Sequence, residues 1–278
     1  DNHDHLHDEF GKAGGVLIAG GSPTFVAGRI ENNHGGGVRV SGGGSTPRFE
    51  QGTVFRGNLN GRALEVYDTG IEMSNCKVEN NPEGGLWYEG VGYAPSVITG
   101  TVFANNGDSL SNNGALHFEI RGGNLSISNC VFYGNKMNGD GADLFSNGLR
   151  FNDDYQGNTI TLSQSVFFHE GTNSNGLHMV SNEFESALAM DHSTFFNDDT
   201  IFGSGNNSVT VEDVFYGIDP RFCEPTSGNF NVAANTMLLE HFENGMLPGL
   251  HLSTGCDAII IAPVFTSYLD EVYDVNED

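Results

Sequence analysis

The chain has 278 residues, of which 36 are Asp or Glu and 11 are Lys or Arg, so its formal net charge at pH 7 is -25. A charge of this sign and size repels nucleic acid, anionic membranes and polyanionic glycans, which leaves cations, neutral glycans and other proteins as the favoured partners. No apolar run reaches the about 18 residues of a membrane-spanning helix. The 39 glycines indicate many turns between strands.

Residues 1–13 form a polar leader in which His3, His5 and His7 alternate, so an extended chain places all three on one side. If Asp1 is the mature terminus, its amine, two backbone nitrogens and the His3 imidazole match a square-planar copper or nickel site. The alternative is a solvated leader without metal. Because the chain starts without Met or a signal peptide, we expect an exported protein, extracellular or on the cell surface.

Residues 14–220 contain a repeat in which an apolar residue follows Thr, Cys or Ser and precedes a polar corner, at intervals of about 23 to 35 residues. A second short strand, such as RALEV or GALHFEI, lies between successive copies. This pattern predicts an all-β fold, a right-handed parallel β-helix (solenoid) of about seven to eight coils. The copies are GTVFRGN at Phe55, NCKVENN at Val78, GTVFANN at Phe103, NCVFYGN at Phe132, QSVFFHE at Phe167 and STFFNDD at Phe196, with weaker ones at Ile30 and near Val214.

Stacked coils place equivalent side chains on top of one another. The six apolar anchors from Phe55 to Phe196 are therefore predicted to form an internal column, and Asn80 and Asn105 a ladder at one corner. Cys76 and Cys130 occupy one coil position and lie two coils apart, with Thr101 between them. They are predicted to be buried free thiols.

Two inserts carry oxygen-rich sequences, NGDGAD with Asp140 and Asp143, and RFNDDYQGN with Asp153 and Asp154. Loops of this composition can hold calcium, although neither has the spacing of the twelve-residue EF-hand loop. Ordinary solvated turns are the alternative.

Aromatic side chains offer a second kind of site, because sugars stack on aromatic rings. Trp87, Tyr88, Tyr93 and Tyr155 are the candidates for binding neutral glycans, and packing within the coils is the alternative interpretation. Catalysis on glycans needs converging carboxyl groups, or a cation and a base. The residues available for such chemistry include Glu119, Glu170, Asp191, Asp198 and Asp199, with His169, His178 and His192, but they show no recognisable catalytic spacing.

Residues 221–278 leave the repeat and are predicted to form a C-terminal cap or tail. Cys223 and Cys256 lie in this section and are the candidates for a disulfide in an oxidising compartment. The apolar run in residues 258–278 favours a strand that covers the end of the rod, or alternatively an assembly strand donated to a neighbouring molecule.

The pattern GGxxx…TxFxNN, with GALHFEIRGGNLSISNCVFYGN as its clearest copy, resembles the repeats of bacterial surface β-helix proteins of the polymorphic outer-membrane-protein and choice-of-anchor types. The resemblance covers roughly residues 14–220, and such repeats serve adhesins, passengers and carbohydrate-active enzymes alike. We therefore predict an extracellular non-catalytic structural or adhesive protein that associates with itself or with other surface proteins. The alternative is a polysaccharide lyase or glycoside hydrolase with its acidic residues on the insert-bearing face.

Overall fold

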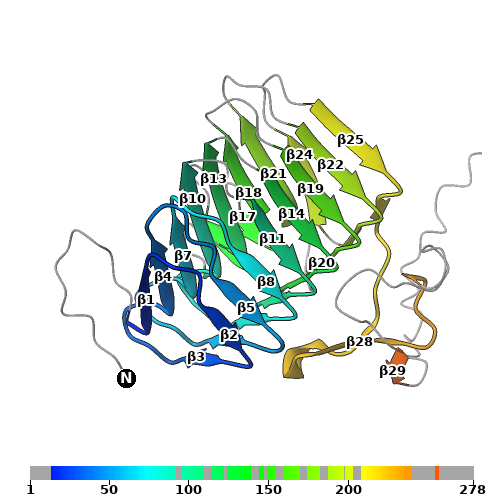
Figure 1. The fold of residues 1–278 in the computed structure, drawn as a ribbon. Coiled ribbons are helices and arrows are strands. Elements are labelled where there is room, and N and C mark those ends of the chain that lie inside the picture. Colours follow the sequence, from blue (N-terminus) through cyan, green and yellow to red (C-terminus); the bar gives the residue numbers. More distant parts are fainter. Residues whose placement is uncertain are drawn as a thin grey trace, which may run out of the picture.

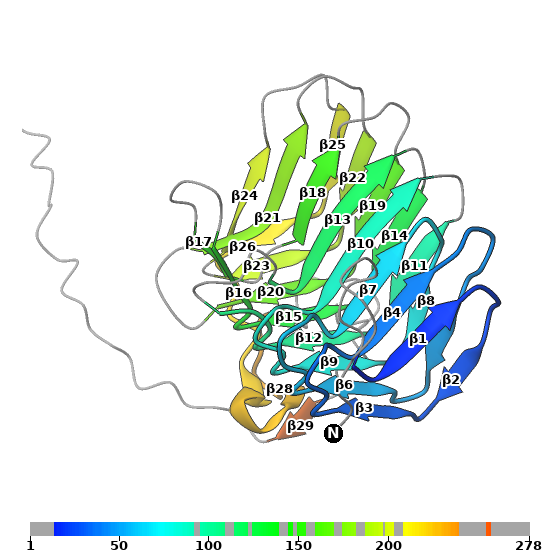
Figure 2. The same ribbon diagram turned by 90° about the vertical axis from the view of Figure 1, so that its left-hand side faces the viewer.

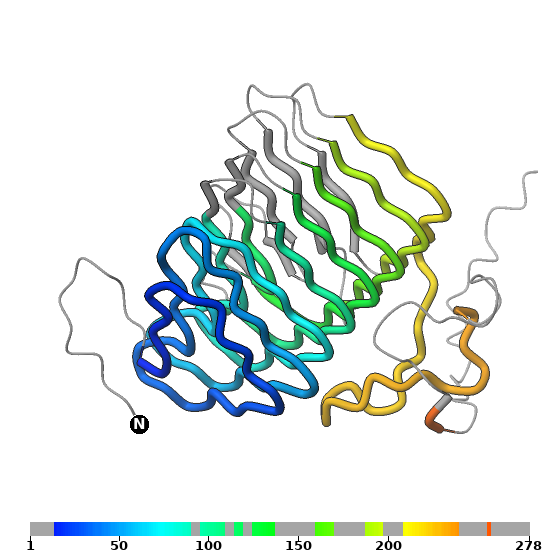
Figure 3. The backbone as a smooth tube through the Cα atoms, viewed as in Figure 1, coloured from blue at the N-terminus to red at the C-terminus, as the bar shows by residue number. Residues whose placement is uncertain are grey.

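The computed structural model describes residues 14–91, 95–108, 114–121, 124–138, 144–146, 149–153, 159–169, 174–181, 187–196, 198–202, 208–238 and 254–256. The chain winds into a rod with three long faces, and each face is a parallel sheet of eight strands (Figure 1). Figure 3 shows the successive turns stacked from the N-terminal end, in blue, to the last turn, in yellow. This architecture confirms the predicted parallel β-helix.

The three sheets take one strand each from every turn, and we name them A, B and C in chain order. Sheet A contains β1 (Val16–Ala19), β4 (Val38–Ser41), β7 (Leu64–Tyr67), β10 (Leu86–Val91), β13 (Leu116–Arg121), β18 (Leu149–Asp153), β21 (Ser174–Ser181) and β24 (Asp198–Phe202). Sheet B contains β2 (Thr24–Val26), β5 (Arg48–Glu50), β8 (Glu72–Ser74), β11 (Ser96–Thr99), β14 (Asn124–Ser128), β19 (Thr159–Ser163), β22 (Ala187–Asp191) and β25 (Ser208–Glu212). Sheet C contains β3 (Arg29–Glu31), β6 (Val54–Arg56), β9 (Lys77–Glu79), β12 (Val102–Ala104), β15 (Val131–Tyr133), β20 (Val166–Phe168), β23 (Thr194–Phe196) and β26 (Phe215–Tyr216).

The remaining strands lie outside the three long sheets. β16 (Lys136–Asn138) and β17 (Leu144–Ser146) pair antiparallel across one insert. β27 (Phe222–Glu224), β28 (Asn229–Ala233) and β29 (Thr254–Cys256) form a small C-terminal sheet with a 3-10 turn at Pro225–Ser227. None of the described residues belongs to a helix that is long and apolar enough to cross a membrane.

A column of apolar side chains on sheet C runs through the core, with one correction to the predicted set. The rings of Phe103, Phe132, Phe167 and Phe195 stack at centroid distances of 5.3, 4.5 and 4.5 Å, and all four are fully buried. The last member is Phe195 rather than the predicted Phe196, which instead stacks on Phe168 at 5.1 Å. Two adjacent phenylalanines gave the strand two possible registers, and a shift of one residue moves a side chain to the opposite face.

The ladder of asparagines at the corner after sheet C is also one residue away from its predicted place. Asn80 and Asn105 are exposed and have positive φ angles of 57° and 53°, so they form the left-handed bend itself. The hydrogen-bonded ladder is made by the residues that follow each bend, and all of its members are buried: Asn33, Asn58, Asn81, Asn106 and Asn135.

Cys76 and Cys130 are buried free thiols, as the sequence predicts. The Cys76 thiol donates to the carbonyl of Phe49 at 3.1 Å, and its backbone amide donates to Thr101 Oγ1 at 3.4 Å. The two cysteines replace hydroxyl residues in a polar column that continues through Ser165 and Ser193. Burial raises the pKa of each thiol to about 12.

We therefore expect Cys76 and Cys130 to resist alkylation by iodoacetamide in the folded protein at pH 8, and to react fully in urea. Because the unfolded thiols ionise near pH 9 and the folded ones near pH 12, the free energy of unfolding should fall as the pH rises across this range. Mass spectrometry of the alkylated protein measures the first effect. Rapid labelling of either cysteine without denaturant would contradict the buried position.

The C-terminal section folds back along the side of the rod and packs on the outer face of sheet C (Figure 2). Phe222 packs edge-on against Phe168 at 5.5 Å, and Phe230 against Tyr133 at 5.4 Å. Ile218, Val232 and Leu238 complete this second apolar cluster on Val102, Ala104, Val131 and Val166. The structure joins Cys223 and Cys256, the predicted pair, in a disulfide. Residues 258–278, with the predicted capping or donated strand, lie outside the described residues.

Candidate binding cleft

Most of the predicted metal ligands lie outside the part of the chain that the structure describes: His3, His5, His7, Asp140, Asp143 and Asp154. Asp153 is the last residue of β18. Among the described residues, no group of three or more His, Cys, Asp or Glu side chains is placed to hold a metal ion. The calcium, copper and nickel sites therefore remain predictions from the sequence.

The aromatic candidates separate into different environments. Tyr88 is only 3 % exposed and packs against Phe118 at 5.2 Å, so its prediction as a sugar platform is wrong. The strand alternates, and Tyr88 points into the core while its neighbour Trp87 points outward. Tyr93 and Tyr155 lie outside the described residues.

Trp87 lies on the outer face of sheet A in a cluster of polar side chains. The Arg62 guanidinium lies 4.1 Å from the centre of the Trp87 ring system, and the His117 ring lies 3.9 Å away. Arg62 also forms an ion pair with Glu65 at 3.1 Å. Since its ring already contacts two neighbours, Trp87 serves as a packing residue here more than as an open sugar platform.

Two of the acid-base candidates, Asp191 and His192, come together at the corner between sheets B and C. His192 Nδ1 contacts the Asp191 carboxylate, and Nε2 lies 3.5 Å from Asp213 Oδ2. The sequence did not single out Asp213, because it lies one turn further along the chain and only the stacking brings it to His192.

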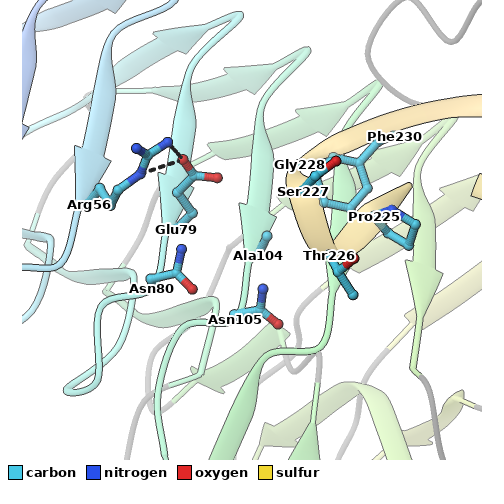
Figure 4. A pocket seen from close by; sticks show the side chains of 10 residues that line it. All are labelled: Arg56, Glu79, Asn80, Ala104, Asn105, Pro225, Thr226, Ser227, Gly228 and Phe230. Atoms are coloured by element: carbon cyan, nitrogen blue, oxygen red, sulfur yellow. Dashed lines mark hydrogen bonds and ion pairs between the residues drawn. The ribbon is translucent and has the colours of Figure 1, made fainter. Parts of the chain in front are cut away.

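A cleft of about 290 Å³ lies between the outer face of sheet C and the C-terminal 3-10 turn. Figure 4 shows its two walls, one from strands β6, β9 and β12 with the bends that follow them, and the other from the turn at Pro225–Ser227. The side chains and backbone groups that line it belong to Arg56, Glu79, Asn80, Ala104, Asn105, Pro225, Thr226, Ser227, Gly228 and Phe230.

The bends and the turn hold the polar groups of the cleft in place. Asn80 and Asn105 adopt the left-handed conformation, so each carboxamide projects from a fixed corner. On the other wall, Ser227 Oγ donates to the carbonyl of Glu224 at 2.9 Å, and Gly228 ends the turn with a φ of 80°. A methyl group at Gly228 would lie 3.8 Å from Glu79 Oε2, which shows how closely the turn approaches the sheet.

Arg56 and Glu79 form the charged floor of the cleft. Arg56 Nε donates to Glu79 Oε1 at 2.8 Å, and a terminal nitrogen of the same guanidinium contacts the same oxygen. The Glu79 side chain is 7 % exposed, whereas that of Arg56 is 44 % exposed. The hydrogen bond to Glu79 raises the pKa of Arg56, so the guanidinium stays charged while its open side faces the cleft.

The chemistry of this cleft is that of a hydrogen-bonding site with little net charge. Two carboxamides and two hydroxyls both donate and accept hydrogen bonds, and the guanidinium offers further donors. Its single carboxylate is already engaged by Arg56. The sequence contains the signal for the second wall in FCEPTSGNF, where Pro and Gly frame a turn, but only the structure shows which face this turn meets.

The three-sheet winding and the stacked polar and aromatic columns define a parallel β-helix protein. The chain belongs to the right-handed β-helix family: the family model described as a right handed beta helix region matches residues 14–214. No curated protein shows a significant match to the chain.

Proposed function

We propose that this protein is an extracellular, non-catalytic adhesive rod that binds a neutral, hydroxyl-rich glycan in the cleft between sheet C and the C-terminal turn. The observation that carries the proposal is the lining of the cleft, where Asn80, Asn105, Thr226 and Ser227 expose uncharged polar groups. Sugar hydroxyls pair with such groups as donors and acceptors at once.

The charge of the protein supports the same class of ligand. At -25 the chain repels acidic polysaccharides at long range, whereas a neutral sugar meets no such barrier. The disulfide between Cys223 and Cys256 supports an oxidising location outside the cytoplasm, and it ties the C-terminal section that forms one wall of the cleft.

A catalytic role in this cleft has less support, because a glycosidase needs two carboxyl groups facing the scissile bond. Of the residues that line the cleft, Glu79 alone has a carboxyl group, and its Oε1 accepts from Arg56. The alternative, a carbohydrate-active enzyme, draws instead on the contact of His192 with Asp191 and Asp213, which offers an acid-base group.

Binding to a panel of neutral oligosaccharides, followed by calorimetry with the best ligand, tests the proposal. Thr226→Trp should fill the cleft and weaken binding by tenfold or more, and Asn105→Gly should weaken it about two- to tenfold through the loss of one or two hydrogen bonds. Asn75→Gly is the matched control, because Asn75 is exposed and has the same φ of 53° but lies outside the cleft.

Unchanged affinity in both cleft variants would overturn the assignment of the cleft. New reducing ends released from the same panel, or unsaturated uronides released from an added uronate polysaccharide, and lost in a His192→Asn variant, would establish the enzyme instead. Asparagine keeps the backbone of that position, since it tolerates the positive φ of 43° that His192 adopts.

A further inference from the structure

The two ends of the rod expose strand edges of matching form. β1, β2 and β3 are the outermost strands of sheets A, B and C at one end, and β24, β25 and β26 are outermost at the other. Within the described residues, no strand pairs with the outer edge of any of these six. Each edge carries a row of backbone donors and acceptors in the arrangement that every inner turn uses to pair with the next.

The core is also cut open at both ends. One inward-facing column on sheet B passes through every turn, from Phe25 at the first to Val211 at the last. All six inner members are at most 1 % exposed: Phe49, Met73, Ile98, Ile127, Leu162 and Met190. Val211 is 51 % exposed although it occupies the same inward position, and Phe25 is only partly buried.

The corresponding column on sheet C ends in the same way. It begins at Ile30 and ends at Tyr216, which stacks on Phe195 with 5.4 Å between ring centroids and is 52 % exposed. A further turn placed on Val211 and Tyr216 would bury both side chains as the inner turns bury their equivalents. Removing such apolar side chains from water stabilises an interface.

The two ends of the rod differ in net charge, and this difference favours contact between unlike ends. Residues 14–70, which exclude the leader of residues 1–13 and its net charge of -3, contain five arginines against four acidic residues, a net charge of +1. Residues 187–220 contain no Lys or Arg and have a net charge of -6. The acidic residues there are Asp191, Asp198, Asp199, Glu212, Asp213 and Asp219. Within the described turns, two like ends therefore repel or are neutral toward each other, whereas the acidic end attracts the arginine-bearing end.

From these observations we propose that copies of this chain stack head to tail, with the β1–β3 end of one molecule continuing the β24–β26 end of the next. Phe25 and Ile30 of one copy then cover Val211 and Tyr216 of the other, and the three sheets run on across the junction. Because the two contacting surfaces differ, the interface is heterologous, so it extends into a linear chain of molecules. The occupant is a second copy, because it offers the same cross-section and the same strand spacing.

The test is sedimentation velocity of the full chain over a range of concentrations, with negative-stain microscopy of the largest species. We expect linear oligomers that lengthen with concentration and shorten as salt screens the charges. Val211→Asp should leave the protein monomeric, and so should Phe25→Asp. Mixed in equal amounts, the two variants should form dimers and nothing larger, because each keeps the one intact end that the other needs.

Val97→Asp is the matched control, since Val97 is 39 % exposed on the flank of sheet B and the substitution adds the same charge. It should associate like the unaltered protein. If Phe25→Asp fails to fold, the double variant Arg29→Glu with Arg48→Glu replaces it, because these side chains are 64 % and 51 % exposed.

Several outcomes would overturn the proposal. A protein that is monomeric at all concentrations has no such interface. If Val97→Asp weakens association as much as the end variants do, the molecules associate through their flanks and not through their ends. Association that survives both end variants but disappears on removal of residues 258–278 is strand donation instead. A mixture of the two end variants that stays monomeric would also contradict head-to-tail stacking.

Discussion

Asn106→Ala is expected to lower the free energy of unfolding by about 2–4 kcal/mol, because it removes an inner member of the buried asparagine ladder. Asn106 Nδ2 donates to the carbonyl of Val78 at 2.8 Å and to Asn135 Oδ1 at 3.0 Å, while its Oδ1 accepts from Asn81 Nδ2 at 2.9 Å. Alanine leaves these buried groups without that partner and opens a gap between adjacent turns. Urea denaturation followed by circular dichroism measures the change.

The neighbouring residue provides the control for this prediction. Asn105 is exposed and left-handed, so Asn105→Gly should alter the free energy of unfolding by less than about 1 kcal/mol. If the two substitutions had equal effects, the ladder would not be what holds the corner together.

Phe132→Ala is expected to lower the free energy of unfolding by about 3–5 kcal/mol, the range for a large aromatic side chain removed from a packed core. Phe132 is fully buried between Phe103 and Phe167 in the aromatic column. The cavity left by the ring cannot collapse easily, because the spacing of the turns above and below is set by backbone hydrogen bonds of β12 and β20. Thermal and urea unfolding both report the loss.

Phe195 and Phe196 allow a matched comparison within one strand. Phe195→Ala should lower the free energy of unfolding clearly more than Phe196→Ala does, since Phe195 is fully buried in the column and Phe196 is only half-buried on the outer face. The reverse order would mean that the register of β23 is wrong by one residue.

The winding of the chain could be predicted from the sequence, because stacking requires the same kind of residue at the same place in each turn. Thr53, Cys76, Thr101, Cys130 and Ser165 recur as small, weakly polar side chains, and the structure places them in one buried column. This recurrence identified the free thiols correctly, because a residue that replaces Thr in a stacked column takes the buried position of that Thr.

Register within a turn was harder to predict than the turn itself. In ENN at 79–81 and ANN at 104–106, two asparagines stand side by side, and composition alone does not tell which one bends the backbone and which one faces inward. The structure assigns the bend to the first and the buried hydrogen bonds to the second. The same uncertainty applied to Trp87 and Tyr88, of which only one can face outward. Because side chains alternate along the strand, Tyr88 faces the core and Trp87 faces outward.

The cleft was beyond the reach of the sequence, because it forms between segments that no repeat relates. Its sheet wall comes from three successive turns, whereas its other wall is a turn that follows the last coil. The apolar patch of Val131, Tyr133 and Val166 is unusual for outward positions of a rod, and this is the signal that something packs there.

The return of the C-terminal section to the middle of the rod sets the order in which the molecule can be completed. Each turn contacts its immediate neighbours, so turns can be added one after another as the polypeptide is made. Phe230 reaches Tyr133 only after roughly a hundred further residues have emerged. A chain interrupted before that point has finished coils but no cleft beside sheet C, so the proposed ligand recognition would belong to the finished molecule alone.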